Sequence, residues 1–412
     1  MKSHTKHTRA VGNNQMKILY ILILLVFTGC ALSKKTQLLK SGNVLQENYS
    51  DNINFDFQTG LPIIKVRING TEANFLFDTG APNVISIELA SKLNLKTEIT
   101  DYVGDSGENT NVQDYVLLDS VSIGNVTYLN TCAIVSNLSS TVPMSCYEID
   151  GIIGTNLMRK SFWKMNYQEY KIYFSNDLIN LKNSNDWDTL QFISNSSGKL
   201  FVNVKINEVN VKEVIFDTGS DGSFNLSKDV YNELRNEKLL TTYSLGSSAF
   251  GIFGLSKGDT TFYSRIETIK LGKVEATKEV IKFNKSKNFI GSKFLLNYSI
   301  ILDWENNLIY MKKVSEKPPT AFESFGIKLI LKDNKVLIGS LFQNSIAIDK
   351  LEIGDEIIEL NGENYQDLSE STLCDLYLSG TSNFKKLNNL NLKIKRVDKI
   401  INVNLQKEVL LK

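Results

Sequence analysis

Two copies of one tripeptide are the residues of this chain best suited to chemistry: Asp78-Thr79-Gly80 and Asp217-Thr218-Gly219. Each copy follows an apolar, strand-like run, FLF before the first and VIF before the second. A chance Asp-Thr-Gly is expected roughly 0.1 times in a chain of this length at average composition. Two copies in matched surroundings therefore indicate two halves of one site built around a pair of carboxylates.

A pair of aspartates can hydrolyse a peptide bond without a metal ion or a covalent nucleophile. One carboxylate takes a proton from water while the other carboxyl group gives a proton to the carbonyl oxygen. Two carboxyl groups about 3 Å apart cannot both ionise, so they share one proton and titrate as a unit. Asp78 and Asp217 are therefore predicted to be the catalytic pair.

The residues that follow the aspartates predict how the pair is held. Gly80 and Gly219 allow a tight turn and the close approach of two loops. The hydroxyl groups of Thr79 and Thr218 can hydrogen-bond into the opposite loop and keep the carboxyl groups coplanar.

The two loops differ at the next position. Ser220 can hydrogen-bond the carboxylate of Asp217, whereas Ala81 offers no such group to Asp78. We therefore expect Asp217 to be the better stabilised anion and Asp78 to hold the shared proton more often.

Composition argues against several other kinds of site. The chain has only two histidines, His4 and His7, and both precede an apolar run at residues 18–27. If this N-terminus is cleaved, no imidazole remains for Ser-His-Asp catalysis or for a histidine-ligated zinc ion. Lys and Arg number 46 against 45 Asp and Glu, which gives no field that would attract nucleic acid. We predict no metal, no cofactor and no nucleic-acid partner.

The N-terminus has the pattern of an export signal. The apolar run is too short to span a bilayer as a helix but suits a signal peptide. It ends in VFTGC, which resembles a bacterial lipobox, so Cys30 is predicted to be lipidated and to anchor the protein in the cell envelope, facing the periplasm or the cell surface. The alternative is a buried apolar segment with an incidental cysteine. Translation can start at Met1 or at Met16.

The remaining cysteines are Cys132, Cys146 and Cys374. In an exported protein they meet an oxidising compartment. Cys132 and Cys146 can pair, or they can be two buried thiols, and spacing alone does not decide between the two.

The region around the two tripeptides is an internal repeat. An apolar-Ile-Gly element follows each aspartate at nearly the same distance, ending at Gly154 and Gly291. Similar hairpin-like runs close each copy, at 162–174 and 297–311. Short helices are expected at 87–95 and 228–239.

The repeat predicts a mainly β fold made of two pseudo-symmetric lobes. The domains follow from these patterns and from linker-like composition. We expect a signal peptide at 1–30, a linker at 31–51, a first lobe at 52–176, a second lobe at 187–313 and a C-terminal domain at 320–410.

The two loops, the Ile-Gly elements and the closing hairpins resemble aspartic proteases of the retropepsin and pepsin type, over about residues 52–313. The resemblance implies two barrel-like lobes related by a pseudo-two-fold axis, with a polypeptide substrate bound between them. It also implies glycine-bearing hairpins that act as flaps, for which 101–111 and 246–258 are the candidates.

The C-terminal hundred residues resemble the PDZ family through the run LEIGDEIIELNG. A helix is expected near 368–377, followed by strands at 390–396 and 399–405. The resemblance implies that Phe325-Gly326-Ile327 forms a loop whose N–H groups bind a peptide C-terminus while the peptide adds a strand. Alternatively the module only docks on the protease or gates access to it.

Together these patterns predict a lipid-anchored aspartic endopeptidase with an appended PDZ-like α+β domain. The alternative is a non-catalytic lipoprotein that binds peptides.

Overall fold

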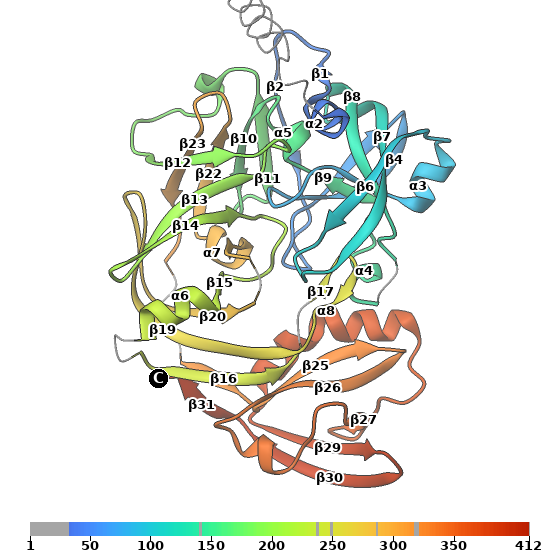
Figure 1. Cartoon of the computed structure of the whole chain (residues 1–412), viewed down its shortest axis with the longest axis vertical. Helices are drawn as coiled ribbons and strands as arrows, with labels where there is room; N and C mark the ends of the chain where they lie inside the picture. Colours follow the sequence, from blue (N-terminus) through green and yellow to red (C-terminus); the bar gives the residue numbers. More distant parts are fainter. Residues whose placement is uncertain are drawn as a thin grey trace, which may run out of the picture.

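A computed structural model describes residues 33–139, 142–235, 239–247, 250–285, 287–316 and 321–411. The predicted signal peptide and Cys30 lie outside these residues. The chain is mainly β, as predicted, and it forms two lobes with a third module against both of them (Figure 1). No helix in the described part of the chain is long and apolar enough to span a membrane.

The first lobe is a set of short strands with buried faces. It contains β3 (Ile63–Ile68), β4 (Thr71–Phe77), β5 (Val84–Ser86), β6 (Thr97–Gly104), β7 (Thr110–Ile123), β8 (Val126–Ser136), β9 (Gly151–Ile153), α3 (Ile87–Lys92), α4 (Val142–Ser145) and α5 (Thr155–Met158). The turn between β3 and β4 is Asn69-Gly70, with φ of 48° and 83°. Positive φ at both central residues matches the right-handed twist of the strands, which explains this Asn-Gly pair.

The second lobe repeats this order. It contains β13 (Leu200–Ile206), β14 (Val209–Phe216), β15 (Phe224–Ser227), β16 (Thr241–Gly246), β17 (Phe250–Gly251), β18 (Gly254–Leu255), β19 (Asp259–Leu271), β20 (Val274–Asn284), β21 (Phe289–Ile290), α6 (Lys228–Leu234) and α7 (Ser292–Leu295). Helices α3 and α6 begin at their predicted residues. Both are capped by a serine, Ser86 or Ser227, whose hydroxyl accepts a backbone N–H of the first turn.

Strand pairing confirms the internal repeat. In the first lobe β4 pairs in parallel with β9, and β5 pairs in parallel with β8. In the second lobe β14 pairs in parallel with β21, and β15 pairs in parallel with β20. The antiparallel pairs β3–β4 and β7–β8 of the first lobe likewise correspond to β13–β14 and β19–β20. The two lobes therefore share one hydrogen-bonding plan.

A sheet of six described strands joins the lobes at their backs. These are β2 (Ser50–Asn54), β11 (Lys171–Ser175), β10 (Phe162–Asn166), β22 (Tyr298–Asp303), β23 (Leu308–Lys313) and β12 (Asp188–Ser194), in that order. The two predicted closing hairpins are β10–β11 and β22–β23, and they pair with each other through β10 and β22. The segment that connects the lobes runs from β11 to β12 of this sheet and contains the short helix η1 (Leu178–Asn180).

Residues 31–51 differ from the predicted linker. From Ser33 onward they carry α2 (Lys34–Lys40) and β1 (Asn43–Val44). Leu38 and Leu39 are buried in the first lobe, and β1 pairs with β8. The segment packs because its two leucines bury apolar surface, which overrides its polar composition.

The C-terminal module has its own apolar core. It contains β24 (Phe322–Ser324), β25 (Ile327–Lys332), β26 (Lys335–Phe342), η3 (Ile346–Asp349), β27 (Glu356–Leu360), β28 (Glu363–Asn364), α8 (Glu370–Lys386), β29 (Asn389–Arg396), β30 (Lys399–Gln406) and β31 (Glu408–Leu411). The helix is longer than predicted, whereas β29 and β30 lie within one residue of their predicted bounds.

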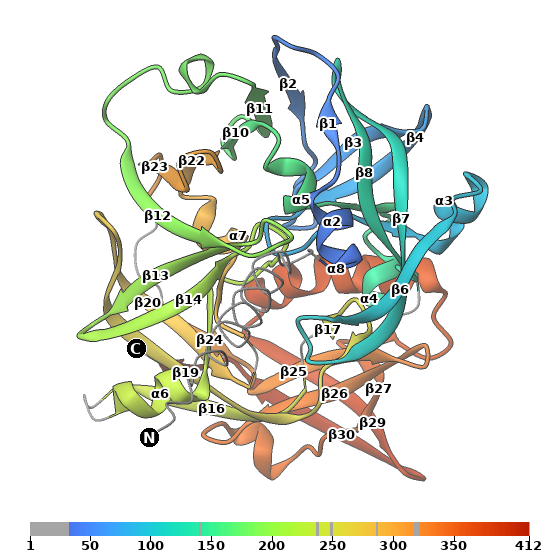
Figure 2. The ribbon, with the colours of Figure 1, turned by 45° about the horizontal axis from the view of Figure 1, so that its top comes forward.

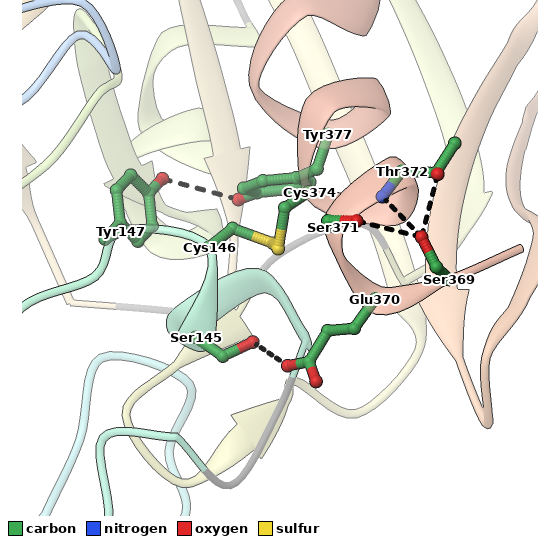
Figure 3. Close-up of a disulfide and its surroundings, with 9 residues drawn as sticks. All are labelled: Ser145, Cys146, Tyr147, Ser369, Glu370, Ser371, Thr372, Cys374 and Tyr377. Atoms are coloured by element: carbon green, nitrogen blue, oxygen red, sulfur yellow. Dashed lines mark hydrogen bonds between the residues drawn. A yellow bond between two sulfur atoms is a disulfide. The ribbon is translucent and has the colours of Figure 1, made fainter.

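The disulfide is neither of the two alternatives left open by the spacing of Cys132 and Cys146. Cys146 is bonded to Cys374 (Figure 3). Cys132 is a buried free thiol. Cys132 lies within β8, in the interior of the first lobe. Cys146 instead follows α4, which packs against α8 of the module. A pairing that crosses 228 positions cannot be inferred from local spacing.

Candidate active site

The two predicted loops follow the ends of equivalent strands. Asp78 comes directly after β4, and Asp217 comes directly after β14. The preceding residues, Phe77 and Phe216, are fully buried in one continuous core. The backbone N–H of each aspartate donates to the strand beside it, at 3.0 Å to Ile153 in the first lobe and at 2.9 Å to Ile290 in the second. The strands thus fix the place from which each carboxyl group extends.

The threonines interlock the loops. Thr79 Oγ1 donates to the carbonyl oxygen of Phe216 (2.5 Å) and accepts the N–H of Thr218 (3.0 Å). Reciprocally, Thr218 Oγ1 donates to the carbonyl oxygen of Phe77 (2.8 Å) and accepts the N–H of Thr79 (3.1 Å). Both side chains have no exposed surface. This two-fold arrangement is the one predicted from the sequence.

The glycines allow the close approach. The N–H of Gly80 donates to Asp78 Oδ1 (2.6 Å), and the N–H of Gly219 donates to Asp217 Oδ1 (2.9 Å). A Cβ atom on Gly80 would lie 2.5 Å from Cγ of Asp217, and one on Gly219 would overlap the carboxyl group of Asp78. Any larger residue at either position would displace the opposite carboxyl group.

The Ile-Gly elements support the loops from behind. Gly154 follows β9 and packs against the backbone of residues 81–83, so a Cβ atom there would overlap the carbonyl carbon of Pro82. Gly291 packs in the same way against the backbone of Gly222. Asn83 ties the first loop further, because its Oδ1 accepts the N–H of Gly154 (2.8 Å).

Each carboxyl group lies against the glycine of the opposite loop, and the two groups influence each other's pKa in a largely buried environment. Burial raises the pKa of Asp78, and the N–H of Gly80 and the carboxyl group of Asp217 act against this shift. Burial raises the pKa of Asp217 well above its ordinary value, and the negative charge of Asp78 raises it further. Both shifts act in the same direction, so the pair favours holding one shared proton.

The hydroxyl of Ser220 makes a contact within its own turn, where its Oγ accepts the N–H of Gly222 (3.4 Å). Which of the two aspartates holds the shared proton more often stays a prediction.

Lys199 is a charged neighbour of the pair that sequence reasoning missed. Burial lowers the pKa of Lys199, while Asp217 and Asp78 raise it. Its positive charge in turn lowers the pKa of both aspartates. The repeat gives no signal for a charge at this position, because the residue that follows Gly60 in the first lobe is Leu61.

The hairpins predicted as flaps meet each other. The first is the turn between β6 and β7, where Asp105 Oδ1 accepts the N–H groups of Gly107 and Asn109. Its Oδ2 accepts the N–H of Phe253 (3.0 Å) in the small hairpin β17–β18 of the second lobe. Ile252 of that hairpin packs against apolar residues of the first lobe. Figure 2 shows β17 beside β6, between the lobes and the module.

The predicted peptide-binding loop of the module contains a glycine in the left-handed region of backbone conformation. Gly326 has φ of 79°, and a Cβ atom there would overlap Ser345. Its N–H donates to Ser324 Oγ (3.1 Å). Phe325 is buried in the core of the module, and Ile327 begins β25. The role of this loop in peptide binding stays a prediction.

Within the described residues, no group of three or more His, Cys, Asp or Glu side chains is placed to hold a metal ion.

Residues 64–157 match the model of the family described as aspartyl protease. A comparison with curated proteins found no match. Among solved structures, a retropepsin-like aspartic protease from Rickettsia conorii is 20% identical, covering 33% of this chain and 93% of its own, with a TM-score of 0.23. Basic 7S globulin from soybean is 12% identical, covering 67% of this chain and 96% of its own, with a TM-score of 0.38. The segment that matches the aspartyl protease family thus contains the first Asp-Thr-Gly loop and its supporting Gly154.

Proposed function

We propose that this protein is an aspartic endopeptidase whose catalytic groups are Asp78 and Asp217. The observation that carries the proposal is the interlocked pair of loops, which places each carboxyl group against the glycine of the opposite loop in a largely buried environment. The match of residues 64–157 to aspartyl proteases supports it.

The proposed mechanism uses the one proton that Asp78 and Asp217 share. The ionised member of the pair takes a proton from a water molecule, which then attacks the peptide carbonyl carbon. The protonated member gives its proton to the carbonyl oxygen, and the tetrahedral intermediate collapses as the amine leaves with a proton returned from the pair. The nearby charge of Lys199 stabilises the anionic member of the pair and extends its working range toward lower pH.

Cleavage of a mixed peptide library by protein from Thr36 onward, between about pH 4 and 8, tests this function. We expect cleavage by the native protein and at least a 10³-fold loss of kcat/KM, of the order reported for loss of a catalytic group, in Asp78→Asn and in Asp217→Asn. Asp119→Asn is the matched control, because Asp119 is an exposed aspartate. Equal activity in the Asn variants and the control would exclude the pair as the catalyst.

The second candidate function is non-catalytic peptide binding. It is favoured by the small exposure of the pair, since Asp78 exposes only 9% of its surface in this structure. Peptide capture without cleavage at any pH in that range, by a correctly folded protein, would support this candidate.

We further propose that the C-terminal module either binds a peptide C-terminus through Phe325, Gly326 and Ile327 or gates access to the carboxyl pair. Its contacts with both lobes support gating. Titration of the native protein and of Gly326→Val with C-terminal peptides tests the first role, because a bulky side chain cannot fit against Ser345.

A lipid anchor at Cys30, with the protein held at the cell envelope, completes the proposal. Metabolic labelling with a fatty acid tests it: we expect label in the native chain and none in Cys30→Ala.

A further inference from the structure

The C-terminal module bridges the two lobes. Figure 1 shows the module against both lobes, with helix α8 on the face of the module that meets α4 of the first lobe. The module therefore has one attachment to each lobe, and the two attachments differ in kind.

The attachment to the second lobe is an extended non-covalent interface. Strand β26 pairs with β16 over residues 340–342 and 244–246. Beside this pairing, Tyr263 stacks on Phe322 at 5.4 Å between ring centroids and contacts Phe342 at 5.2 Å. Sheet hydrogen bonds together with an apolar cluster make this interface continuous with the fold of the second lobe.

The attachment to the first lobe is small and is centred on a disulfide. Cys146 follows α4 and bonds to Cys374 of α8. Two polar contacts lie beside the bond (Figure 3): Ser145 Oγ donates to Glu370 at 2.8 Å, and the hydroxyl groups of Tyr147 and Tyr377 lie 3.5 Å apart. Without the covalent bond, these contacts would have to hold two separate parts of the chain together by themselves.

Little of the carboxyl pair is exposed. Asp78 is almost fully buried, Asp217 is partly buried, and the hairpins of the two lobes are joined by the bond from Phe253 to Asp105. We expect a polypeptide to reach the pair only after these hairpins move apart, which requires the two lobes to shift relative to each other. The disulfide limits that separation, because it ties the first lobe to a module that is fixed on the second.

We propose that the Cys146–Cys374 disulfide is a redox-controlled latch, and that its reduction opens the enzyme to polypeptide substrates. The inference rests on the proposed protease function. It also concerns peptide binding by the module, because α4 packs against both α8 and β25, the strand to which a peptide would add.

The step itself is thiol–disulfide exchange with a dithiol reductant. One thiolate of the reductant attacks a sulfur of the bond, and the other cysteine leaves as a thiolate that takes up a proton. The second thiol of the reductant then displaces the remaining cysteine, so two electrons and two protons pass to Cys146 and Cys374 while the reductant becomes a disulfide. Cys374 is only partly buried and offers the point of attack, whereas Cys146 is buried.

Hydrogen exchange measured by mass spectrometry tests the latch without relying on activity. We expect faster exchange of the α8 amides in the reduced native protein and in Cys374→Ser than in the oxidised native protein, with the β10–β22 sheet unchanged. Cys132→Ala is the matched control, because it removes the free buried thiol and leaves the disulfide. Equal exchange in the oxidised and reduced proteins would overturn the latch.

Cleavage of a folded protein substrate and of a short peptide then tests gating. Reduction or Cys374→Ser should raise kcat/KM for the protein substrate roughly 5-fold or more, with a smaller effect on the peptide. An unchanged or lower rate, with the sheet still protected, would contradict gating. If no form cleaves any substrate, the protease proposal fails, and the exchange data still decide whether the disulfide restrains α8.

Discussion

Four buried hydrogen bonds between Thr79, Thr218 and the two opposite strands hold the loops together at the residue scale. Each hydroxyl satisfies one N–H and one carbonyl of the other lobe. These backbone groups have no access to water, so the hydroxyls are needed for stability as well as for alignment of the carboxyl groups.

Replacing Thr218 by the nearly isosteric Val tests this contact. The N–H of Thr79 and the carbonyl of Phe77 would lose their partner, which should lower the free energy of unfolding by about 2–4 kcal/mol. Urea unfolding measures the change. Thr218→Ser keeps the hydroxyl and should lose only about 1 kcal/mol; equal losses in the two variants would show that packing, and not the hydrogen bonds, is responsible.

Asp217→Asn should stabilise the fold while it removes activity. The pKa of Asp217 is raised in the folded state, so the folded protein holds a proton that the unfolded chain releases, and stability falls as pH rises from about 4 through the raised pKa. An uncharged amide does not titrate, so the variant should not lose stability as the pH rises. We expect its free energy of unfolding at pH 7 to exceed that of the native protein by roughly 1–2 kcal/mol. Denaturant titrations at pH 4 and pH 7 check it; a variant that is less stable than the native protein at pH 7 would contradict the shift.

At the scale of elements, the positions of the loops depend on the glycines that follow β9 and β21. Gly154 and Gly291 have φ of −114° and −108°, values that other residues adopt easily. Glycine is therefore required at these positions only because there is no room for a side chain, which would overlap the backbone of the loop that follows the aspartate.

Gly154→Ala should accordingly cost stability and activity together. The added methyl group would overlap the backbone at Pro82, which cannot rotate away, so we expect a loss of about 3 kcal/mol or more and displacement of Asp78. Thermal unfolding and peptide cleavage measure the two effects. Gly104→Ala is the control, because the nearest atom to its Cβ position is 3.8 Å away; similar losses in both variants would mean that the effect is not local.

Much of this arrangement could be predicted from the sequence, because duplication makes it visible twice. The paired motifs located both loops, both supporting glycines and both closing hairpins. The Cys146–Cys374 bond could not be predicted, since it depends on how separate units dock. The contact of Ser220 with Gly222 could not be predicted either, because no local pattern reveals which rotamer the serine adopts.

At the scale of the whole molecule, docking of the module buries charge as well as apolar surface. Lys328 of β25 donates to the hydroxyl of Tyr263 and lies 4.7 Å from the centroid of that ring. Burial lowers the pKa of Lys328 to about 8, and Asp221 opposes this only in part. The interface therefore contains an ammonium group that is less stable there than in water.

Lys328→Met should stabilise the docked module at neutral pH. Between about pH 8 and 10.5 the unfolded chain binds the lysine proton and the folded protein does not, so the cost of the buried charge is present in full below about pH 8 and disappears as the pH rises toward 10.5. The substitution should raise the free energy of unfolding by roughly 1–2 kcal/mol at pH 7. This figure already subtracts about 1 kcal/mol for the lost contact with the Tyr263 ring.

Denaturant unfolding at pH 7 and pH 10 measures the difference in stability between Lys328→Met and the native protein. This difference should be smaller at pH 10. Lys335→Met is the control. Lys335 is an exposed lysine of the same module, paired with Glu356 at 2.8 Å, and this pairing raises its pKa, so its contribution is favourable at pH 7 and is lost only above its ordinary pKa. A Lys328 variant that behaves like the Lys335 variant would place the Lys328 ammonium in contact with water, and the module would then be docked less closely than the contacts with Tyr263 require.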